Sequence, residues 1–450
     1  MITLLTLGVV ALAAGVFGVL LLDLTVRRAE VGAAFVLAAM VLQAAYVNEV
    51  PSLSPGGVRI GITDVLFVFV VGAGLARLLR VRRYSTLLRW LLLLGTVALV
   101  SLLRGVAAFG PQAAVNDFRQ YLQFLGAATY FATFRPTPER CHRIGLVFLA
   151  ATVPMMILVC LRWMATFGGV DLGPLSATYD AAIRAVNGPE TFFFAVAALL
   201  TLPAWQLAGR QARRIRSFGM VLLLFVTILD RRTVWITMIA GVAVLALHNP
   251  RLGRRALTWG AAAALVTVVL FAAYSSVGTS QEPLAQTADN TATLTWRVEG
   301  WTELLQSWSE NPANWFVGEA FGSGFVRKVD GSEVDSHPHN FYVETTLRTG
   351  IVGLVALVVL LVGLARAVWR WQVPAPSEAA FLLAPEMFPV LLVMQLVWCI
   401  TWIPGVEQGI LTGLAVALAA ARSAARSRSR GQRRPTRPTV PLPAPAGVAR

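Results

Sequence analysis

Two histidines are the side chains of this sequence best suited to acid–base chemistry. His337 and His339 flank Pro338 in a polar stretch that precedes an apolar segment. Because the unperturbed pKa of histidine is close to neutral, either imidazole can accept a proton from an attacking hydroxyl group. We interpret His339 as the general base and keep His337 as the alternative. A histidine that only makes a hydrogen bond within a loop is the competing interpretation.

Arginines are the second group of candidates. A very short turn, residues 230–233 (Asp-Arg-Arg-Thr), joins two apolar segments. A guanidinium group matches phosphate oxygens in a bidentate manner, so we interpret Arg231 or Arg232 as a ligand of an anionic lipid head group. Alternatively, Asp230 pairs with one arginine and water solvates the other. The other cationic candidates also lie beside apolar segments, where a charge needs a partner or a ligand; they are Arg119, Arg184 and Arg297. Arg297 could equally pair with Glu299 or Glu303.

The elements that position these residues must be membrane-spanning helices. Of the 450 residues, 56% are hydrophobic and only 14% are charged. This composition excludes a soluble enzyme and a disordered scaffold. The net charge is +15, but in a membrane protein arginines mark the cytoplasmic loops, so we expect no nucleic-acid partner.

Apolar runs near the spanning length of about 20 residues recur along the chain. They predict an all-α, polytopic integral membrane bundle with about 12 or 13 spans. The predicted spans lie near residues 2–23, 31–47, 63–77, 86–103, 117–134, 144–165, 189–208, 217–229, 234–248, 256–274, 350–368, 385–402 and 406–421.

Arginine clusters occupy every second loop, which predicts the orientation and the domain organisation. Residues 1–274 form the first part of the bundle and residues 350–421 the last spans. Between them, residues 275–349 form a large extracytoplasmic loop domain. Residues 422–450, rich in arginine and proline, form a disordered basic cytoplasmic tail that touches anionic lipid.

The predicted loop domain has a charge opposite to that of the rest of the chain. Residues 275–347 contain ten acidic side chains and three basic ones. Apolar side chains at three- and four-residue spacing predict an amphipathic helix that ends at Asn311-Pro312, with a tryptophan-rich face at the membrane interface. Gly318, Gly322 and Gly324 follow it and allow a tight, closely approaching backbone.

No metal-binding cluster and no nucleotide-binding motif is present in the sequence. We therefore expect neither a metal nor a cofactor.

These features together resemble the O-antigen ligase and O-antigen polymerase superfamily of bacterial membrane proteins. Four stretches carry the resemblance: 184–189 (Arg-Ala-Val-Asn-Gly-Pro), the 230–233 turn, 296–322 with its Trp-Arg start and glycines, and 339–342 (His-Asn-Phe-Tyr) before the 350–353 glycines. Many relatives carry a second histidine where Phe341 stands here. The resemblance extends over residues 60–418.

The resemblance implies a metal-independent, inverting glycosyltransferase of the bacterial inner (plasma) membrane. It would move a glycan from undecaprenyl diphosphate to a hydroxyl of a glycan, glycolipid or protein acceptor on the outer face. His339 would be the base, with Asn340, His337 and Asp230 as secondary candidates. Arg232 and Arg184 would be the first-choice diphosphate ligands, followed by Arg231, Arg297 and Arg119.

Three alternatives stay open at this point. A polymerase of the same superfamily uses the same donor and differs only in its acceptor. A lipid-linked glycan transporter or flippase predicts charges deep inside spans and internal repeats, and the sequence has little of either. A non-catalytic scaffold for envelope assembly leaves the arginine turn and the histidine stretch without a role.

Overall fold

The protein is an almost entirely helical bundle. The computed structural model describes residues 2–46, 51–54, 59–81, 83–176, 185–275, 292–329, 331–369 and 380–432. The helices of the first half are α1 (Ile2–Arg27), α2 (Ala29–Tyr46), α3 (Ile62–Leu78), α4 (Thr86–Phe109), α5 (Pro111–Ala132), α6 (Pro138–Gly168) and α7 (Gly188–Leu200). Those of the second half are α8 (Arg210–Ile228), α9 (Arg232–His248), α10 (Pro250–Ser275), α12 (Ala292–Glu310), α13 (Pro312–Val317), α14 (Phe341–Trp369), α15 (Phe388–Trp398) and α16 (Val406–Gln432).

Short elements complete the described structure. Two antiparallel pairs of strands are present, β1 (Ser52–Leu53) with β2 (Ile60–Gly61) and β3 (Val326–Val329) with β4 (Ser332–Asp335). Single 3₁₀ turns occupy η2 (Gly173–Ser176), η3 (Leu202–Gln206) and η4 (Pro385–Met387).

Each predicted span coincides with a helix of the structure, and the all-α class is confirmed. Within the described residues, six helices are long and apolar enough to cross a membrane: α2, α4, α6, α7 with η3, α14 and α16. The protein is therefore a polytopic membrane protein. Helix starts follow local chemistry, since the side chains of Ser85, Thr137 and Asn187 each accept a hydrogen bond from a backbone N–H at the start of the helix that follows.

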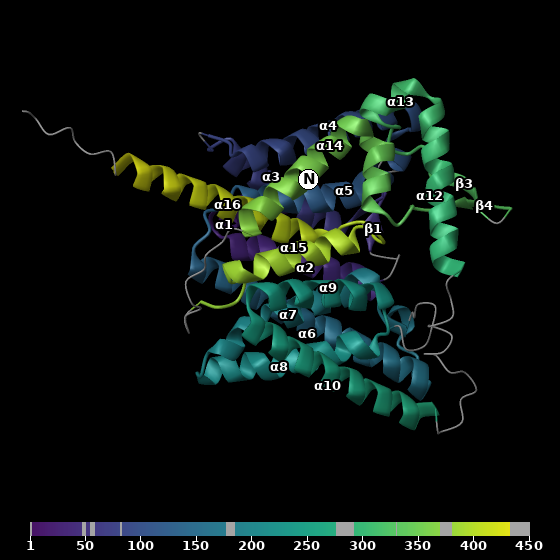
Figure 1. Ribbon diagram of the computed structural model, residues 1–450. Helices are drawn as coiled ribbons and strands as arrows, with labels where there is room; N and C mark the ends of the chain where they lie inside the picture. Colours follow the sequence, from purple (N-terminus) through teal and green to yellow (C-terminus); the bar gives the residue numbers. More distant parts are fainter. Residues whose placement is uncertain are drawn as a thin grey trace, which may run out of the picture.

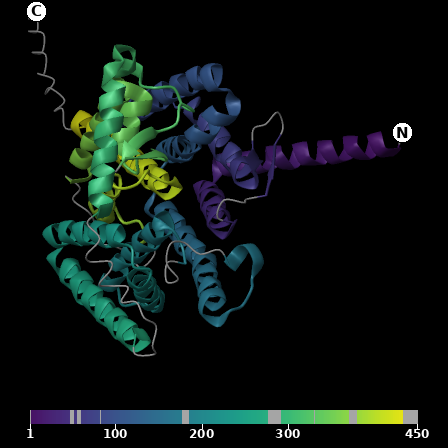
Figure 2. The ribbon, with the colours of Figure 1, turned by 90° about the vertical axis from the view of Figure 1, so that its right-hand side faces the viewer.

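Helix α5 is a central element of the bundle. It packs against α3, α4 and α16, while α14 packs on α4 and α15 on α9. Most helices run roughly along one direction, whereas α12 stands across their ends beside the β3–β4 hairpin (Figure 1). The view from that end shows α12 in front of the bundle and α1 projecting away from it (Figure 2). Helix α12 and the β3–β4 hairpin therefore lie at one end of the bundle.

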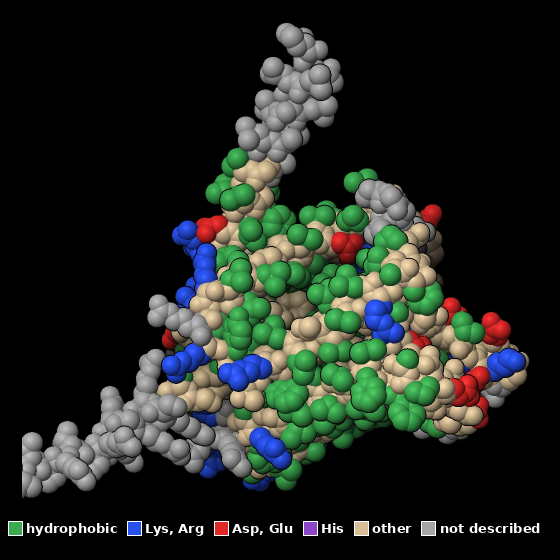
Figure 3. All heavy atoms as spheres, turned by 90° about the horizontal axis from the view of Figure 1, so that it is seen from above, with side chains coloured by type: hydrophobic (Ala, Val, Ile, Leu, Met, Phe, Trp, Pro, Cys, Tyr) green, Lys and Arg blue, Asp and Glu red, His purple; other side chains and the backbone are tan. Residues whose placement is uncertain are grey.

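The surface has a broad apolar belt and a charge asymmetry. Outward side chains such as Val68, Ile239 and Leu265 are more than 60% exposed, which suits contact with lipid tails. On the face shown in Figure 3, arginines gather toward the end from which α16 extends, and acidic side chains gather at the opposite end, around the β3–β4 hairpin.

Two helix boundaries differ from the predictions. Helix α14 begins at Phe341, nine residues before the predicted span, and is kinked at Gly350, whose φ is 63°. Its first turns carry Glu344 and Arg348, which hydropathy alone assigned to the loop. Helix α16 continues to Gln432, although residues 422–450 were expected to be disordered; alanine and arginine are strong helix formers and extend the helix. Residues 433–450 lie outside the described part of the chain.

The tryptophan-rich face of α12 also differs from the prediction, because it packs on protein. Trp308 is 9% exposed and packs with Phe325 and Leu347, and the indole N–H of Trp301 donates to the carbonyl of Pro338 at 2.6 Å. These two aromatic side chains find their partners in the neighbouring loop and α14. The helix itself ends at Glu310, directly before Asn311-Pro312, as predicted.

A close contact between α4 and the segment after α13 gives a test of this packing. A Cβ atom on Gly105 would lie 2.0 Å from the carbonyl oxygen of Phe321, whereas a Cβ on Gly95 of the same helix meets nothing within 4 Å. We expect Gly105→Ala to lower the free energy of unfolding by about 1–3 kcal/mol. Gly95→Ala should be neutral or add up to about 1 kcal/mol. Denaturant unfolding of the protein in micelles measures both, and equal stability of the two variants would contradict the packing.

Candidate functional site

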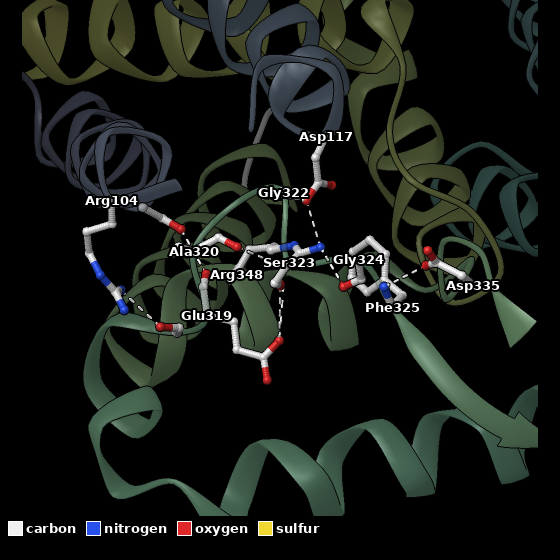
Figure 4. A network of polar contacts seen from close by, with 12 residues as sticks. Arg104, Asp117, Glu319, Ala320, Gly322, Ser323, Gly324, Phe325, Asp335 and Arg348 are labelled. Carbon is white, nitrogen blue, oxygen red and sulfur yellow. Dashed lines mark hydrogen bonds and ion pairs between the residues drawn. The ribbon is translucent and has the colours of Figure 1, made fainter. Parts of the chain in front are cut away.

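A buried ion pair fastens the segment between α13 and β3 to the bundle. Arg348 of α14 is fully buried, and its Nη2 lies 2.7 Å from a carboxylate oxygen of Asp117 on α5. The same guanidinium donates to the carbonyl oxygens of Ala320 at 3.1 Å and Gly324 at 2.9 Å (Figure 4). It also lies over the ring of Phe325, 4.0 Å from the ring centre. One side chain therefore joins two helices and the loop.

Further contacts complete this network. The backbone N–H of Gly322 donates to Asp117 at 2.8 Å, and that of Phe325 donates to Asp335 at 2.8 Å. Arg104 of α4 donates to the carbonyl of Gly318 at 3.0 Å (Figure 4). Gly318 and Gly322 have φ values of 70° and 93°, a region that favours glycine, as their types led us to expect.

The histidine stretch lies directly between this network and α14. Arg327 of β3 donates to the carbonyl of Ser336 at 2.7 Å, and Trp301 holds the carbonyl of Pro338. At the other end, Asn340 accepts hydrogen bonds from the N–H groups of Tyr342 and Val343, and so caps α14. Asn340, predicted as a secondary site residue, is positioned as a helix cap.

Both histidines line one polar cavity. Its volume is about 560 Å³, and it lies among α2, α5, α7, the β1–β2 pair and the segment after α15. Its polar lining includes His337, His339, Arg59, Arg119, Asp64, Glu190, Glu407 and several amides, together with Trp402. A cavity of this size with converging polar groups is typical of a ligand site.

His337 is oriented by a carboxylate. Its Nδ1 lies 3.4 Å from Glu344, which is fully buried on the first turn of α14. Burial on its own would lower the pKa of His337, but the nearby Glu344 carboxyl group outweighs it and raises the pKa above its ordinary value. His337 therefore tends toward the protonated form.

His339 is held in a different environment. Its backbone is in the left-handed region, with a φ of 51°, and its ring lies edge-on to Trp402 with 5.0 Å between centroids. Burial first, and then the positive charges of Arg297, His337 and Arg327, lower the pKa of His339 to about 4. The imidazole is therefore neutral near pH 7 and has a free lone pair.

Two of the predicted arginines, Arg119 and Arg297, lie near the histidines. Arg119 lines the cavity but pairs with Asp64 at 3.1 Å and donates to the carbonyl of Arg59 at 2.7 Å. Arg297 acts on His339 through its charge, and burial lowers the pKa of this guanidinium. Its Nε atom is buried and has no hydrogen-bond partner among the described residues.

The 230–233 turn lies beside the cavity. Arg231 donates to the carbonyl of Val186 at 3.0 Å, next to Asn187, which lines the cavity. Arg232 begins α9 and does not line the cavity. Asp230 is 4% exposed in the turn, with a φ of 47°. Arg184 lies outside the described residues.

Several site residues were missed by the sequence reasoning. Arg348 and Glu344 were hidden because hydropathy placed the start of the span at residue 350. Asp117 was the first residue of a predicted span, so a search for opposite charges at the starts of spans would have found the pair with Arg348. Arg59 gave no signal in the sequence, since it lies in a polar loop.

Among the described residues, no group of three or more His, Cys, Asp or Glu side chains could hold a metal ion.

A comparison with known protein families finds one that part of the chain resembles. Residues 217–358 match the sequence model of a family described as O-antigen ligase. This part of the chain is similar to the O-antigen ligase family. The matched segment runs from α8 into α14 and so contains the arginine turn, α12 and both histidines, whereas Asp117, Arg119 and Arg59 precede it. No curated protein matches the chain.

The family consists of ligase- or polymerase-like membrane enzymes that use a lipid-linked glycan and a glycan acceptor. The resemblance predicted from the motifs is thereby confirmed at the level of the superfamily. Donor lipid, acceptor and mechanism are matters for the proposal below.

The buried ion pair predicts an unequal effect of two arginine substitutions. Arg348→Met leaves Asp117 buried without its partner, so we expect a loss of about 3–5 kcal/mol in the free energy of unfolding. Arg27→Met removes an ion pair with Asp23 whose side chains are 75% and 51% exposed, and should cost at most about 1 kcal/mol. Denaturant unfolding of both variants provides the comparison, and similar losses would contradict a structural role for Arg348.

The two histidines should titrate in opposite directions from an ordinary imidazole. In the protein with ¹⁵N-labelled histidine, we expect a midpoint near pH 4 for His339 and a midpoint above the ordinary value for His337. Glu344→Gln removes the charge that raises the pKa of His337, so its midpoint should fall while that of His339 changes little. Assignment by His337→Gln and His339→Gln identifies the signals. A midpoint of His337 that does not respond to Glu344→Gln would refute the dyad.

Proposed function

We propose that this protein transfers a glycan from undecaprenyl diphosphate to an acceptor hydroxyl on the outer face of the bacterial inner membrane. The observation that carries the proposal is the cavity in which His337 and His339 meet, with Arg297 and Arg231 close by, in a chain that is similar in part to the O-antigen ligase family. An imidazole beside guanidinium groups suits the two needs of the reaction, a base for the acceptor and positive charge for the leaving diphosphate.

His339 serves as the base in this proposal. Its pKa of about 4 in the free protein keeps it neutral, and part of the lowering comes from Arg297. When a diphosphate binds Arg297, its negative charge offsets that of the guanidinium, so the pKa of His339 rises toward the range useful for a base. Donor binding would thus strengthen the base that the acceptor needs.

The arginines hold the diphosphate. Arg297 has a buried nitrogen without a hydrogen-bond partner in the described part of the chain, and Arg231 lies next to the cavity wall. We place these two before Arg232 and Arg184 as ligands, with Arg119 as a further contact. The acceptor oxygen attacks the anomeric carbon from the face opposite the diphosphate, which inverts the centre. The acceptor proton passes to His339, and the diphosphate leaves as an anion whose charge the arginines stabilise, so we propose a step that uses neither a proton donor nor a metal ion.

The charge asymmetry supports the proposed orientation. Arginines gather at one end of the bundle and acidic side chains at the end that carries α12 (Figure 3). Since cytoplasmic loops retain arginine and lysine, the cavity end faces outward in this proposal. A ligase and a polymerase share this donor geometry and differ in the acceptor, so the polymerase is the second candidate.

The test compares matched histidines in a transfer assay with membranes, a lipid-linked glycan donor and the native acceptor. We expect His339→Ala to slow transfer by about 10²–10⁴-fold, the usual contribution of a general base. His248→Ala, at the far end of α9, is the control and should keep the wild-type rate. Wild-type transfer by His339→Ala at equal protein level would end the proposed role.

The arginine turn allows a second matched comparison. We expect Arg231→Gln to reduce the rate by about 10²–10³-fold, because a cation that stabilises the leaving group is lost. Arg232→Gln should have a smaller effect, since Arg231, and not Arg232, is held next to the cavity wall by its hydrogen bond to Val186. The same assay measures both, and a larger loss for Arg232→Gln would assign the phosphate contact to the other arginine.

A further inference from the structure

One wall of the cavity is not used by the transfer step. It consists of Trp402, two acids and a set of amides from α2 and α5. The amides are Gln43, Asn116, Gln120 and Gln123, and the acids are Glu190 and Glu407. These residues lie outside the segment that matches the family, which ends at residue 358.

The acids of this wall are buried with unused hydrogen-bonding capacity. Glu407 is 1% exposed, and its Oε1 has no hydrogen-bond partner among the described residues. The same holds for Oε2 of Glu190. A buried carboxyl oxygen without a partner costs free energy, so such groups in a cavity wall indicate a polar ligand.

The aromatic part of the wall is rigid and close to His339. The ring of Trp402 lies parallel to that of Trp398, at 7° and 5.6 Å between centroids, and Trp398 stacks in turn on Phe192 at 4.5 Å. The ring of His339 is 5.0 Å from Trp402. A ligand beside Trp402 is therefore next to the proposed base.

The chemistry of this wall matches a sugar ring. Hydroxyl groups both donate and accept hydrogen bonds, which suits amides and carboxyl groups alike, and the C–H face of a sugar packs on an indole. The two acids disfavour a diphosphate in this part of the cavity. Within the proposed function, on which this inference rests, we propose that Trp402, Glu407, Glu190 and the α5 amides form a subsite that binds a sugar ring of the glycan beside His339.

Binding of simple sugars tests the subsite without any transfer reaction. The probes are methyl glycosides of glucose, galactose, mannose, rhamnose and N-acetylglucosamine, observed by saturation-transfer NMR with the full chain in nanodiscs. We expect at least one glycoside to receive saturation through its ring protons. Gln120→Leu should weaken its binding about fivefold, the net value of one hydrogen bond, and Trp402→Leu and Glu407→Leu should weaken it more.

Controls separate loss of the subsite from loss of the fold. Gln112→Leu lies on the same helix as Gln120 but does not line the cavity, and Trp369→Leu replaces an exposed tryptophan of α14; both should bind as wild type. Because Gln120 is itself exposed to the cavity, its variant should keep the wild-type unfolding midpoint. Absence of saturation for all five glycosides, or equal binding by Gln120→Leu and wild type, would overturn the subsite.

Further results show whether the bound sugar belongs to the donor or to the acceptor, and they separate the subsite proposal from the proposed function. If the hexose 1-phosphate displaces the methyl glycoside better than the glycoside itself does, the subsite holds the donor sugar; if not, it holds the acceptor. If transfer depends on His339 but no glycoside binds, the subsite proposal is wrong and the proposed function stands. If a glycoside binds but His339→Ala transfers at the wild-type rate, the role of His339 as base is wrong and the subsite proposal stands.

Discussion

The buried pair of Arg348 and Asp117 is the interaction on which the site geometry depends. Each of these charges loses several kcal/mol of hydration when it is buried. The structure compensates with a contact of 2.7 Å, the carbonyl oxygens of Ala320 and Gly324, and the ring of Phe325. Because these partners belong to α14, α5 and the loop, the cost is offset only when all three are docked. The pair therefore fixes the first turn of α14, and the histidine stretch that leads into it.

A second constraint acts on His339 itself. A left-handed backbone at a residue other than glycine costs about 1–3 kcal/mol and persists only where the surroundings determine it. The carbonyl before His339 is held by Trp301, and the residue after it caps α14. These contacts set the ring beside Trp402 and near Arg297. The low pKa of His339 thus follows from how the loop is held at both of its ends.

Sequence reasoning located the helices and the histidine stretch because both leave local signals. Apolar length predicted the helices, six of which are long and apolar enough to cross a membrane among the described residues, and glycine, proline and histidine types pointed to the stretch between Gly318 and Asn340. It missed Arg348 and Glu344, because a hydropathy window cannot tell a polar first turn of a helix from a loop. The tryptophans of α12 were assigned to lipid, because an amphipathic pattern does not say which apolar surface covers it. The preference for Arg231 over Arg232 in the proposed function rests on a hydrogen bond to Val186, which lies 45 residues away in the chain and leaves no signal in the sequence.

Helix α5 connects these constraints through its periodicity. Asn116, Gln120 and Gln123 are spaced by four and three residues, so they share one face and line the cavity together. Asp117 follows Asn116 by one residue, about 100° around the helix, and so points to Arg348 instead. About two turns of α5 therefore carry both the anchor of the histidine loop and three of the amides that line the cavity. Since a helix is stiff, the anchor of the histidine loop and these three amides keep a fixed spacing, whereas Trp402, Glu190 and Glu407 of the proposed subsite come from other elements.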